Sequence, residues 1–237
     1  MASELIVSGM VVVEGAIDKA DRTAKHGDKD AQHRLDVLTR VNELLENEKP
    51  ARDGEWGDDD KAILRNYGIM TAKPVLYVAN VSEDAVNCES NGAKTVASHA
   101  TASGGESVAV CATLESEIAE LDADDQTEML ESMELSEPAV GPLARALNTL
   151  LGLSTFYTAG EKEVRAWSIP EGAPAPQAAG TIHSDIERGF IRAECYHVDD
   201  LFNLASEKAI KEAGKLRSEG KGYSMQDGDV VNFLFNV

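Results

Sequence analysis

The sequence predicts an α/β protein of 237 residues in three successive parts. Apolar residues recur at helical spacing over residues 1–70, which predicts an antiparallel helical hairpin. Two apolar runs of strand length, separated by a weakly helical stretch, occur in residues 71–153 and predict a parallel α/β sheet. From Ser154 to the end (residues 154–237) short strands alternate with turns, which predicts a small mixed sheet wrapped on a helix.

The first part is predicted to contain one helix from residue 3 to about residue 25 and a second helix after a turn at residues 26–30. In this turn Gly27 suits a helix C-cap and Asp28 suits an N-cap. Apolar or small residues recur every three or four positions in each helix: Leu5, Gly9, Val12, Ala16 and Ala20, then Ala31, Leu35, Leu38, Val41 or Asn42, and Leu45. Two helices joined by so short a turn must run antiparallel.

A polar, breaker-rich loop at residues 48–60 follows the hairpin. Asp58 or Asp59 is expected to cap a short helix that runs through Arg65 and stops at Gly68.

The second part contains two apolar runs, KPVLYVANVSE at 73–83 and SVAVCATLE at 107–115. Residues 75–79 are apolar in succession without alternation, which is typical of a strand covered on both faces. A helix is expected between the runs, from Ala85 to Ala102. Strands that alternate with helices favour a parallel sheet.

Small polar residues follow each predicted strand where it should end. Ligands of open parallel sheets bind just beyond the carboxyl ends of the strands. Asn80 and Glu83 therefore fall where a nucleotide base could be recognised, and Cys111, Ala112 and Thr113 fall at the same height on the next strand.

The stretch from Cys111 to Pro138 contains ten Asp or Glu and no Lys or Arg. Apolar residues interrupt it at helical spacing, so it predicts a solvated acidic helix or helix pair. We favour this interpretation over a dedicated site for a basic partner. A further helix is expected from Leu143 to Leu151.

The third part is predicted as a series of short elements. In order, these are strands at Phe156-Tyr157 and Val164–Ile169, a helix at Ala178–Arg188, a strand at Phe190–His197, a helix from Asp199 or Asp200 through Ala213, a hairpin turn at Asp227–Asp229 and a closing strand at 230–237. Gly228 in the Asp-Gly pair is the hairpin signal.

The formal net charge of −20 is unusual for a chain of this length. Residues 1–153 carry 13 Lys/Arg against 29 Asp/Glu, and residues 154–237 carry 9 against 13. So acidic a surface repels phosphate backbones, which excludes DNA and leaves RNA contact only to a local basic strip.

The cysteines and histidines indicate a reduced, metal-free protein. Cys88, Cys111 and Cys195 are odd in number and widely spaced, which indicates free thiols in the cytoplasm. The histidines show no metal-ligand spacing: His26, His33, His99, His183 and His197. No apolar run is long enough for a signal peptide or a membrane span, so we expect a soluble cytoplasmic protein.

NVSE at 80–83, followed about thirty residues later by CATLESEIAEL, resembles the base-recognising end of the YchF-type Obg-like ATPases. This branch of the translation-factor P-loop NTPases has N-x-x-E where ordinary GTPases have N-K-x-D. The closing stretch, from TFYTAGEKEVRAW to QDGDVVNFLFNV, is similar to the family's TGS domain. The resemblance implies part of a P-loop-type parallel sheet with an inserted helical hairpin, followed by a β-grasp TGS domain.

The resemblance also implies which nucleotide is bound. Glu83 is one methylene longer than the usual Asp, so the bidentate geometry that selects guanine is expected to fail and adenine, from ATP, is expected to be accepted. Asn80 would hold the loop to the base edge and Val81 would give apolar contact. Residues 111–113 would meet the base mainly through backbone groups. A bare N-x-x-E is usually only a turn, but its place after a buried strand favours the site, and a nucleophilic role for Cys111 is less favoured.

The chain contains no G-x-x-x-x-G-K-[ST] sequence, which binds phosphates and Mg²⁺ in this family. We therefore expect a fragment or truncated relative that has the base-recognising loops without the phosphate-binding half. No residue is predicted to be catalytic, and we expect weak ATP affinity and no turnover, with Mg²⁺ bound only in a complete family member.

The resemblance implies the ribosome or ribosomal RNA as partner, contacted by the hairpin as a projecting arm and by the TGS domain. The basic residues available for RNA lie together in sequence, near Tyr223: Lys208, Lys211, Lys215, Arg217 and Lys221. Their charges are balanced by neighbouring glutamates, so an ordinary exposed face is an equal alternative. The alternative function is a non-enzymatic ribosome- or RNA-binding module.

Overall fold

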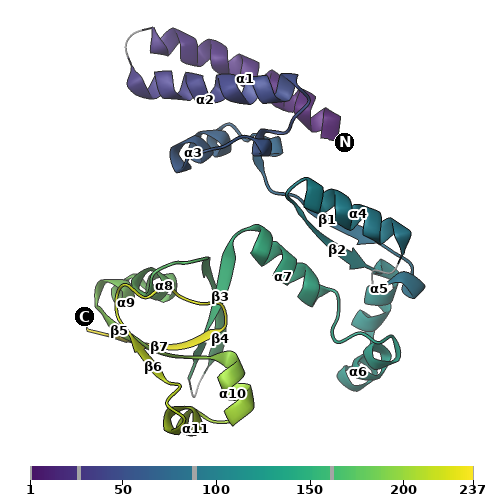
Figure 1. The fold of residues 1–237 in the computed structure, drawn as a ribbon, viewed down its shortest axis with the longest axis vertical. Helices are drawn as coiled ribbons and strands as arrows, with labels where there is room; N and C mark the ends of the chain where they lie inside the picture. The colour runs from purple at the N-terminus through teal and green to yellow at the C-terminus, as the bar shows by residue number, and fades with distance from the viewer. Residues whose placement is uncertain (1, 26–27, 87–89, 161–162, 237) are drawn as a thin grey trace. The chain divides into compact units, whose positions relative to one another are not determined.

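A computed structural model describes residues 2–25, 28–86, 90–160 and 163–236 (Figure 1). The chain divides into two compact units, Met1–Val75 and Leu76–Val237. His26, Gly27 and Cys88, considered in the sequence analysis, lie outside the described residues.

The first unit is helical, and its elements are α1 (Ala2–Ala24), α2 (Lys29–Glu46), the 3₁₀ turn η1 (Ala51–Asp53), α3 (Asp58–Asn66) and the 3₁₀ turn η2 (Met70–Ala72). Helices α1 and α2 lie side by side and antiparallel, as the sequence predicts (Figure 1). Asp28 caps α2 as predicted, because its side chain accepts hydrogen bonds from the backbone N–H groups of Asp30 and Ala31.

The buried face of the hairpin differs in part from the prediction. The α1 residues in the core are Val13, Ala16 and Ala20, whereas Val12 is 43% exposed and Leu5 is 39% exposed. The predicted stripe was therefore wrong at Leu5 and Val12: of the two positions three and four residues before Ala16, α1 buries Val13 and leaves Val12 exposed. The buried face of α2 was predicted more closely and contains Ala31, Val37, Leu38, Val41 and Leu45.

Helix α3 begins differently from the prediction. Gly57 occupies the N-cap position, and neither Asp58 nor Asp59 caps the helix. Asp60 reaches back to accept from the Gly57 N–H at 3.3 Å. Its carboxylate also contacts Arg40, which ties α3 to α2.

The second unit begins with a small parallel α/β region. Its elements are β1 (Leu76–Asn80), η3 (Glu83–Ala85), α4 (Asn91–Ala102), β2 (Glu106–Val110), α5 (Ala112–Glu120), α6 (Ala123–Ser132) and α7 (Val140–Leu150). Strands β1 and β2 pair in parallel from Leu76↔Glu106 to Asn80↔Val110, as predicted. The acidic stretch forms the predicted helix pair, α5 and α6.

The prediction that the first strand is covered on both faces was wrong. No residue of β1 or β2 is fully buried, and Val78 is 53% exposed. The two strands form a sheet of their own in the described part of the chain, with α4 against Tyr77 through an edge-to-face contact with His99. Helix α4 also begins later than predicted, because the Ser90 hydroxyl caps it.

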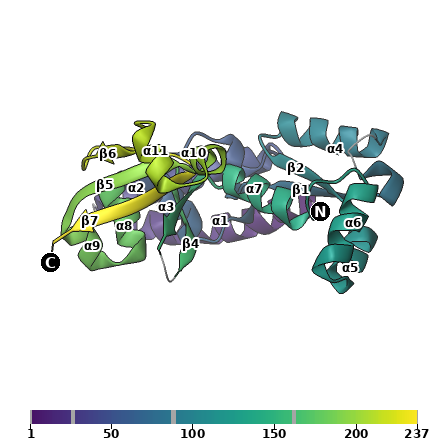
Figure 2. The ribbon, with the colours of Figure 1, turned by 90° about the horizontal axis from the view of Figure 1, so that it is seen from below.

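The last part of the second unit is a five-stranded mixed sheet of order β4-β3-β7-β5-β6. Its elements are β3 (Leu153–Ala159), β4 (Val164–Pro170), α8 (Ala175–Ile182), α9 (Ser184–Arg188), β5 (Phe190–His197), α10 (Val198–Leu204), α11 (Glu207–Glu212), β6 (Arg217–Glu219) and β7 (Asp229–Phe235). Helices α8 and α9 lie on one face and α10 and α11 on the other (Figure 2).

Three predictions in this region were wrong, each for a local backbone reason. The helix predicted at 178–188 is two helices, because His183 is extended and caps α9. The helix predicted through Ala213 is also two, since Ala205 is left-handed (φ 60°) and Ser206 caps α11. Asp227–Asp229 is not a hairpin turn, because β7 pairs with β5 and β3 rather than with the preceding strand β6.

Candidate functional site

The ends of β1 and β2 bring the two predicted base-recognising loops together. Asn80 is the last residue of β1 and lies opposite Val110. Its side-chain Oδ1 accepts a hydrogen bond of 3.2 Å from the backbone N–H of Ala112, the first residue of α5. One residue further, the Val81 N–H donates to the Val110 carbonyl at 2.9 Å. These two bonds hold side by side two loops that are about thirty residues apart in sequence.

The predicted site residues divide into an exposed and a buried group. Asn80, Glu83, Ala112 and Thr113 are exposed. Cys111 is 2% exposed and packs with Leu114 and Ile118. Val81 packs against the same small cluster, so the structure places its side chain toward the protein interior.

The exposed group offers both hydrogen-bond donors and acceptors at the carboxyl ends of β1 and β2. Asn80 keeps its Nδ2 donors, for which the described residues provide no partner, and Glu83 presents a carboxylate in the turn η3. The edge of a purine base carries donors and acceptors together, so this set can be matched by a base. At the start of α5, Cys111 and Leu114 are buried whereas Ala112 and Thr113 are exposed. The start of α5 therefore presents Ala112 and Thr113 on the same exposed side as Asn80 and Glu83.

The triphosphate and Mg²⁺ of a bound ATP find no comparable groups. Across the described ranges no cluster of three or more His, Cys, Asp or Glu could hold a metal ion. The sequence has no glycine-rich phosphate-binding loop. The side chains at the ends of β1 and β2 thus offer hydrogen bonds of the kind that a base edge can match, and the described residues offer no ligand cluster for Mg²⁺.

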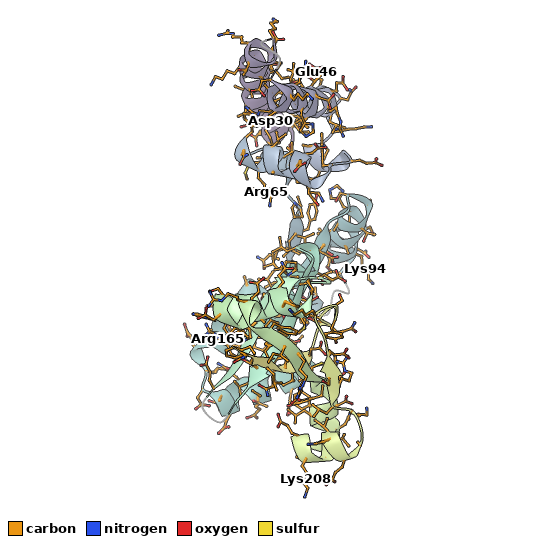
Figure 3. All side chains as sticks on the ribbon, turned by 90° about the vertical axis from the view of Figure 1, so that its left-hand side faces the viewer. Asp30, Glu46, Arg65, Lys94, Arg165 and Lys208 are labelled. Carbon is orange, nitrogen blue, oxygen red and sulfur yellow. The ribbon has the colours of Figure 1, made fainter. Side chains whose placement is uncertain are left out.

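The predicted basic strip does not form one surface. Lys208 and Lys211 are exposed on α11, where Figure 3 shows Lys208 pointing away from the ribbon, and Lys221 is exposed in the loop after β6. The Lys215 ammonium is 2.5 Å from the Asp200 carboxylate and joins the chain after α11 to α10. Arg217 points in a different direction, into the sheet.

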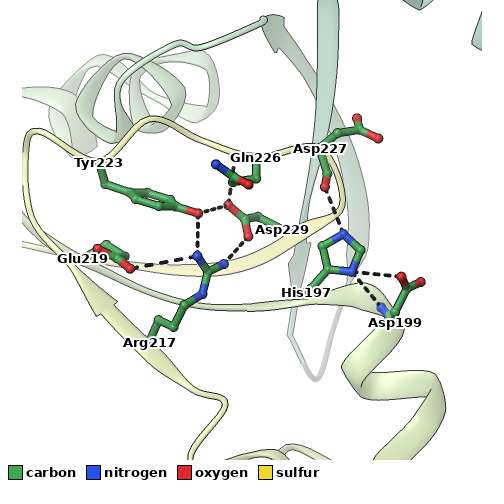
Figure 4. Close-up of polar contacts among 8 residues, drawn as sticks. All are labelled: His197, Asp199, Arg217, Glu219, Tyr223, Gln226, Asp227 and Asp229. Atoms are coloured by element: carbon green, nitrogen blue, oxygen red, sulfur yellow. Dashed lines mark hydrogen bonds and ion pairs between the residues drawn. The ribbon is translucent and has the colours of Figure 1, made fainter.

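Arg217 belongs to a partly buried network around Asp229, which was not predicted from the sequence (Figure 4). Its Nη2 is 2.6 Å from Oδ1 of Asp229, a residue with no exposed surface. The Tyr223 hydroxyl donates to the other carboxylate oxygen at 2.7 Å and accepts from Arg217 at 2.8 Å. Burial, and then the bond to Asp229, raise the pKa of Tyr223. The only sequence signal for Asp229 is an acid at the start of an apolar strand.

The comparisons with known proteins agree with the resemblance. Residues 153–236 match the family YchF-GTPase_C, described as "Protein of unknown function (DUF933)". Over 99% of its length the chain is 45% identical to the "Ribosome-binding ATPase YchF" of Bacillus subtilis and of Escherichia coli O157:H7. It spans 64% of the length of either relative.

The structure resembles that of the Schizosaccharomyces pombe YchF GTPase, with a TM-score of 0.80 and 26% identity, covering 98% of this chain and 64% of that one. Across the described residues, no helix is both long and apolar enough to span a membrane.

Proposed function

We propose that residues 80–83 and 111–113 form the base-binding part of an adenine-nucleotide site, since the chain is similar to the YchF ribosome-binding ATPases over 64% of their length. The observation that carries the proposal is the hydrogen bond from the Ala112 N–H to Asn80 Oδ1. This bond fixes two loops at the carboxyl ends of adjacent parallel strands, where ligands of such sheets bind.

Within this site Asn80 acts first as a positioning residue, because its amide oxygen is occupied by Ala112. Its Nδ2 donors and the Glu83 carboxylate are then available to the base edge. A site with a displaced carboxylate penalises guanine, whose two adjacent donors need one correctly placed acceptor group. The buried Cys111 side chain supports the loop by packing against Leu114 and Ile118.

The proposal assigns no hydrolytic step to these residues. Phosphoryl transfer needs groups that surround the γ-phosphate and its Mg²⁺, and the residues above meet only the base. The chain therefore supplies base selection, and its contribution to an ATPase depends on phosphate-binding groups from elsewhere.

Isothermal titration of the chain with ATP and with GTP, in the presence of Mg²⁺, tests this proposal. We expect weak binding that favours ATP, that is lost in Asn80→Ala and that persists in Asn148→Ala, a matched change on α7. Equal affinity for both nucleotides, or unchanged binding by Asn80→Ala, would contradict it. Phosphate release by the chain above that of the buffer would show that a catalytic group has been overlooked.

A second function is favoured by the exposed lysines of the C-terminal region. We propose that a cytoplasmic ribosome is the partner, and that Lys208, Lys211 and Lys221 contribute to the contact without any nucleotide. Co-sedimentation with ribosomes at increasing salt tests it. A Lys208/Lys211/Lys221→Glu triple variant should pellet less than the wild type, whereas Lys94→Glu, changed at an exposed position of α4, should not.

Lys215 and Arg217 are left unchanged in this experiment because both form internal ion pairs. A loss of pelleting after their substitution would not distinguish contact from unfolding. Identical pelleting of the triple variant at every salt concentration would remove these lysines from the ribosome contact.

A further inference from the structure

Strand β7 lies between β5 and β3, but only its edge toward β5 is paired along the whole strand. On one side it pairs with β5 from Phe190↔Phe235 to His197↔Asp229. On the other side its ladder with β3 consists of the single pair Tyr157↔Val230. From Val231 onward, β7 thus has no strand partner on the β3 side among the described residues. An unpaired strand edge offers backbone N–H and C=O groups to another extended chain.

Two grooves meet at this open edge, and both are lined by Ala159, Val231 and Asn232. The first groove lies on the side of the sheet that carries α8 and α9. Its lining is mainly apolar and aromatic, and the side chains that give it this character are Trp167, Ile182, Ile186, Phe233 and Phe235. Phe235 is 44% exposed although it ends a core strand, so the groove is open to solvent.

The second groove lies on the side that carries α10 and α11, and its lining is charged. Its acids already have partners, since Glu194 is 2.9 Å from Arg192 and Glu207 accepts from the Tyr196 hydroxyl at 3.0 Å.

Two lysines of α11 complete the second groove. Lys208 makes only a long, exposed pair of 3.9 Å with Glu212. For Lys211, no ion pair occurs with any residue that the structure describes. Because Arg192 neutralises Glu194, these two lysines outnumber the one remaining carboxylate of the lining, Glu207.

We propose that the gap between β3 and β7 is an interaction surface for an extended peptide whose side chains alternate between apolar and acidic. Successive side chains of a strand point to opposite faces of a sheet. A strand added to the open edge of β7 would thus place its apolar side chains in the aromatic groove and its acidic ones beside Lys208 and Lys211. Added strands of this kind take affinity from backbone hydrogen bonds and specificity from the alternate pockets.

The observations favour a peptide over single-stranded RNA. A nucleic acid needs a continuous basic path for its phosphates, whereas residues 154–237 contain 9 Lys/Arg against 13 Asp/Glu. Arg165 is the one cation at the aromatic groove, and its guanidinium lies 4.3 Å from the centre of the Trp167 ring. The stacking surface that a base would need is thus already covered. This inference does not depend on nucleotide binding by the first loops.

The experiment is an NMR titration of the full chain with two capped pentapeptides and one RNA. The first peptide is acetyl-Glu-Phe-Glu-Phe-Glu-amide, the second has Lys in place of each Glu, and the RNA is a single-stranded oligouridylate. We expect saturable shifts of the backbone amides of residues 231–235 and of α11 with the acidic peptide. The Lys peptide and the RNA should bind about tenfold more weakly or not at all.

A charge-reversal variant provides the specific control. Lys208→Glu/Lys211→Glu should lose the acidic peptide and gain the Lys peptide, while Lys221→Glu should behave as the wild type. Three results would overturn the proposal: no saturable shifts with either peptide, shifts away from β7 and α11, or saturable binding of the RNA alone.

Discussion

The two sheets of the second unit differ in how far the burial of their side chains stabilises them. In the five-stranded sheet Phe156, Ala193 and Cys195 are fully buried, and helices cover both faces. In the β1–β2 pair no strand residue is fully buried, and the nearest core is the small cluster around Leu114. A two-stranded sheet by itself is marginally stable, so its order depends on a few hydrogen bonds at its ends.

This difference places the main packed core and the proposed base-binding loops in different regions. The five-stranded sheet keeps its shape through packing and through the network around Asp229. The β1–β2 pair carries the loops of the proposed site, and Asn80 is its most important single contact. Loops that bind ligands commonly lie on the less stable parts of a protein.

The largest expected effect on the free energy of unfolding comes from removing a packed core side chain, which the five-stranded sheet has and the β1–β2 pair lacks. Phe156→Ala should lower the free energy of unfolding by about 3–5 kcal/mol, because it leaves a cavity between Trp167 and Phe233. Val78→Ala, on an exposed position of β1, should cost less than about 0.5 kcal/mol. Native-state hydrogen exchange, followed at β5 for the first variant and at β1 for the second, measures both changes, and losses of equal size would contradict the expected difference between the sheets.

The network around Asp229 should give the next effect. Tyr223→Phe removes the hydroxyl that donates to Asp229 and should cost about 1.5–3 kcal/mol, since that bond is made to a buried carboxylate. Tyr157→Phe is the matched control within the same sheet, because its hydroxyl has no hydrogen-bond partner in the described ranges. Thermal unfolding of the two variants checks this, and equal midpoints would show that the network contributes little.

A smaller and more local effect is expected at the β1–β2 loops. Asn80→Ala should weaken the anchoring of α5 by about 0.5–1.5 kcal/mol, the net value of one hydrogen bond. Hydrogen exchange should be faster at the Ala112 amide and unchanged in β5 and β7. Acceleration spread over both sheets would mean that their stabilities are coupled.

The smallest effect is a dependence on alkaline pH confined to the five-stranded sheet. Burial, and then the bond to Glu207, raise the pKa of Tyr196 from 10.0 to about 12. The unfolded chain therefore loses this proton first, so the stabilisation is complete below pH 10 and is lost as the pH rises toward 12. Urea unfolding at a series of pH values should show a shallower decline for Tyr196→Phe than for the wild type, and parallel curves would contradict this.

Features that follow from local patterns could be predicted from the sequence. The strand Phe190–His197 was predicted at its observed bounds, because apolar and polar residues alternate along it. The hairpin and its Asp28 cap were predicted from helical spacing and a turn. The proximity of Asn80 to residues 111–113 followed from the rule that carboxyl ends of parallel strands lie at one edge.

Features that depend on distant partners could not be predicted. An apolar run such as residues 75–79 indicates a buried strand, but only the tertiary structure shows that Val78 remains exposed. Arg217 has the same charge as Lys211 in sequence, and nothing local shows that it pairs with Asp229. Strand β6 is three residues long, too short for a periodic pattern.

The central claim is that residues 80–83 and 111–113 together bind a purine base, and an NMR titration with adenosine tests it most directly, since this ligand carries no phosphate. We expect saturable shifts of the Asn80 side-chain amide and of the Ala112 and Thr113 backbone amides. These shifts should be weaker with guanosine and absent in Asn80→Ala. Shifts that are missing at these residues, or that survive in the variant, would contradict it.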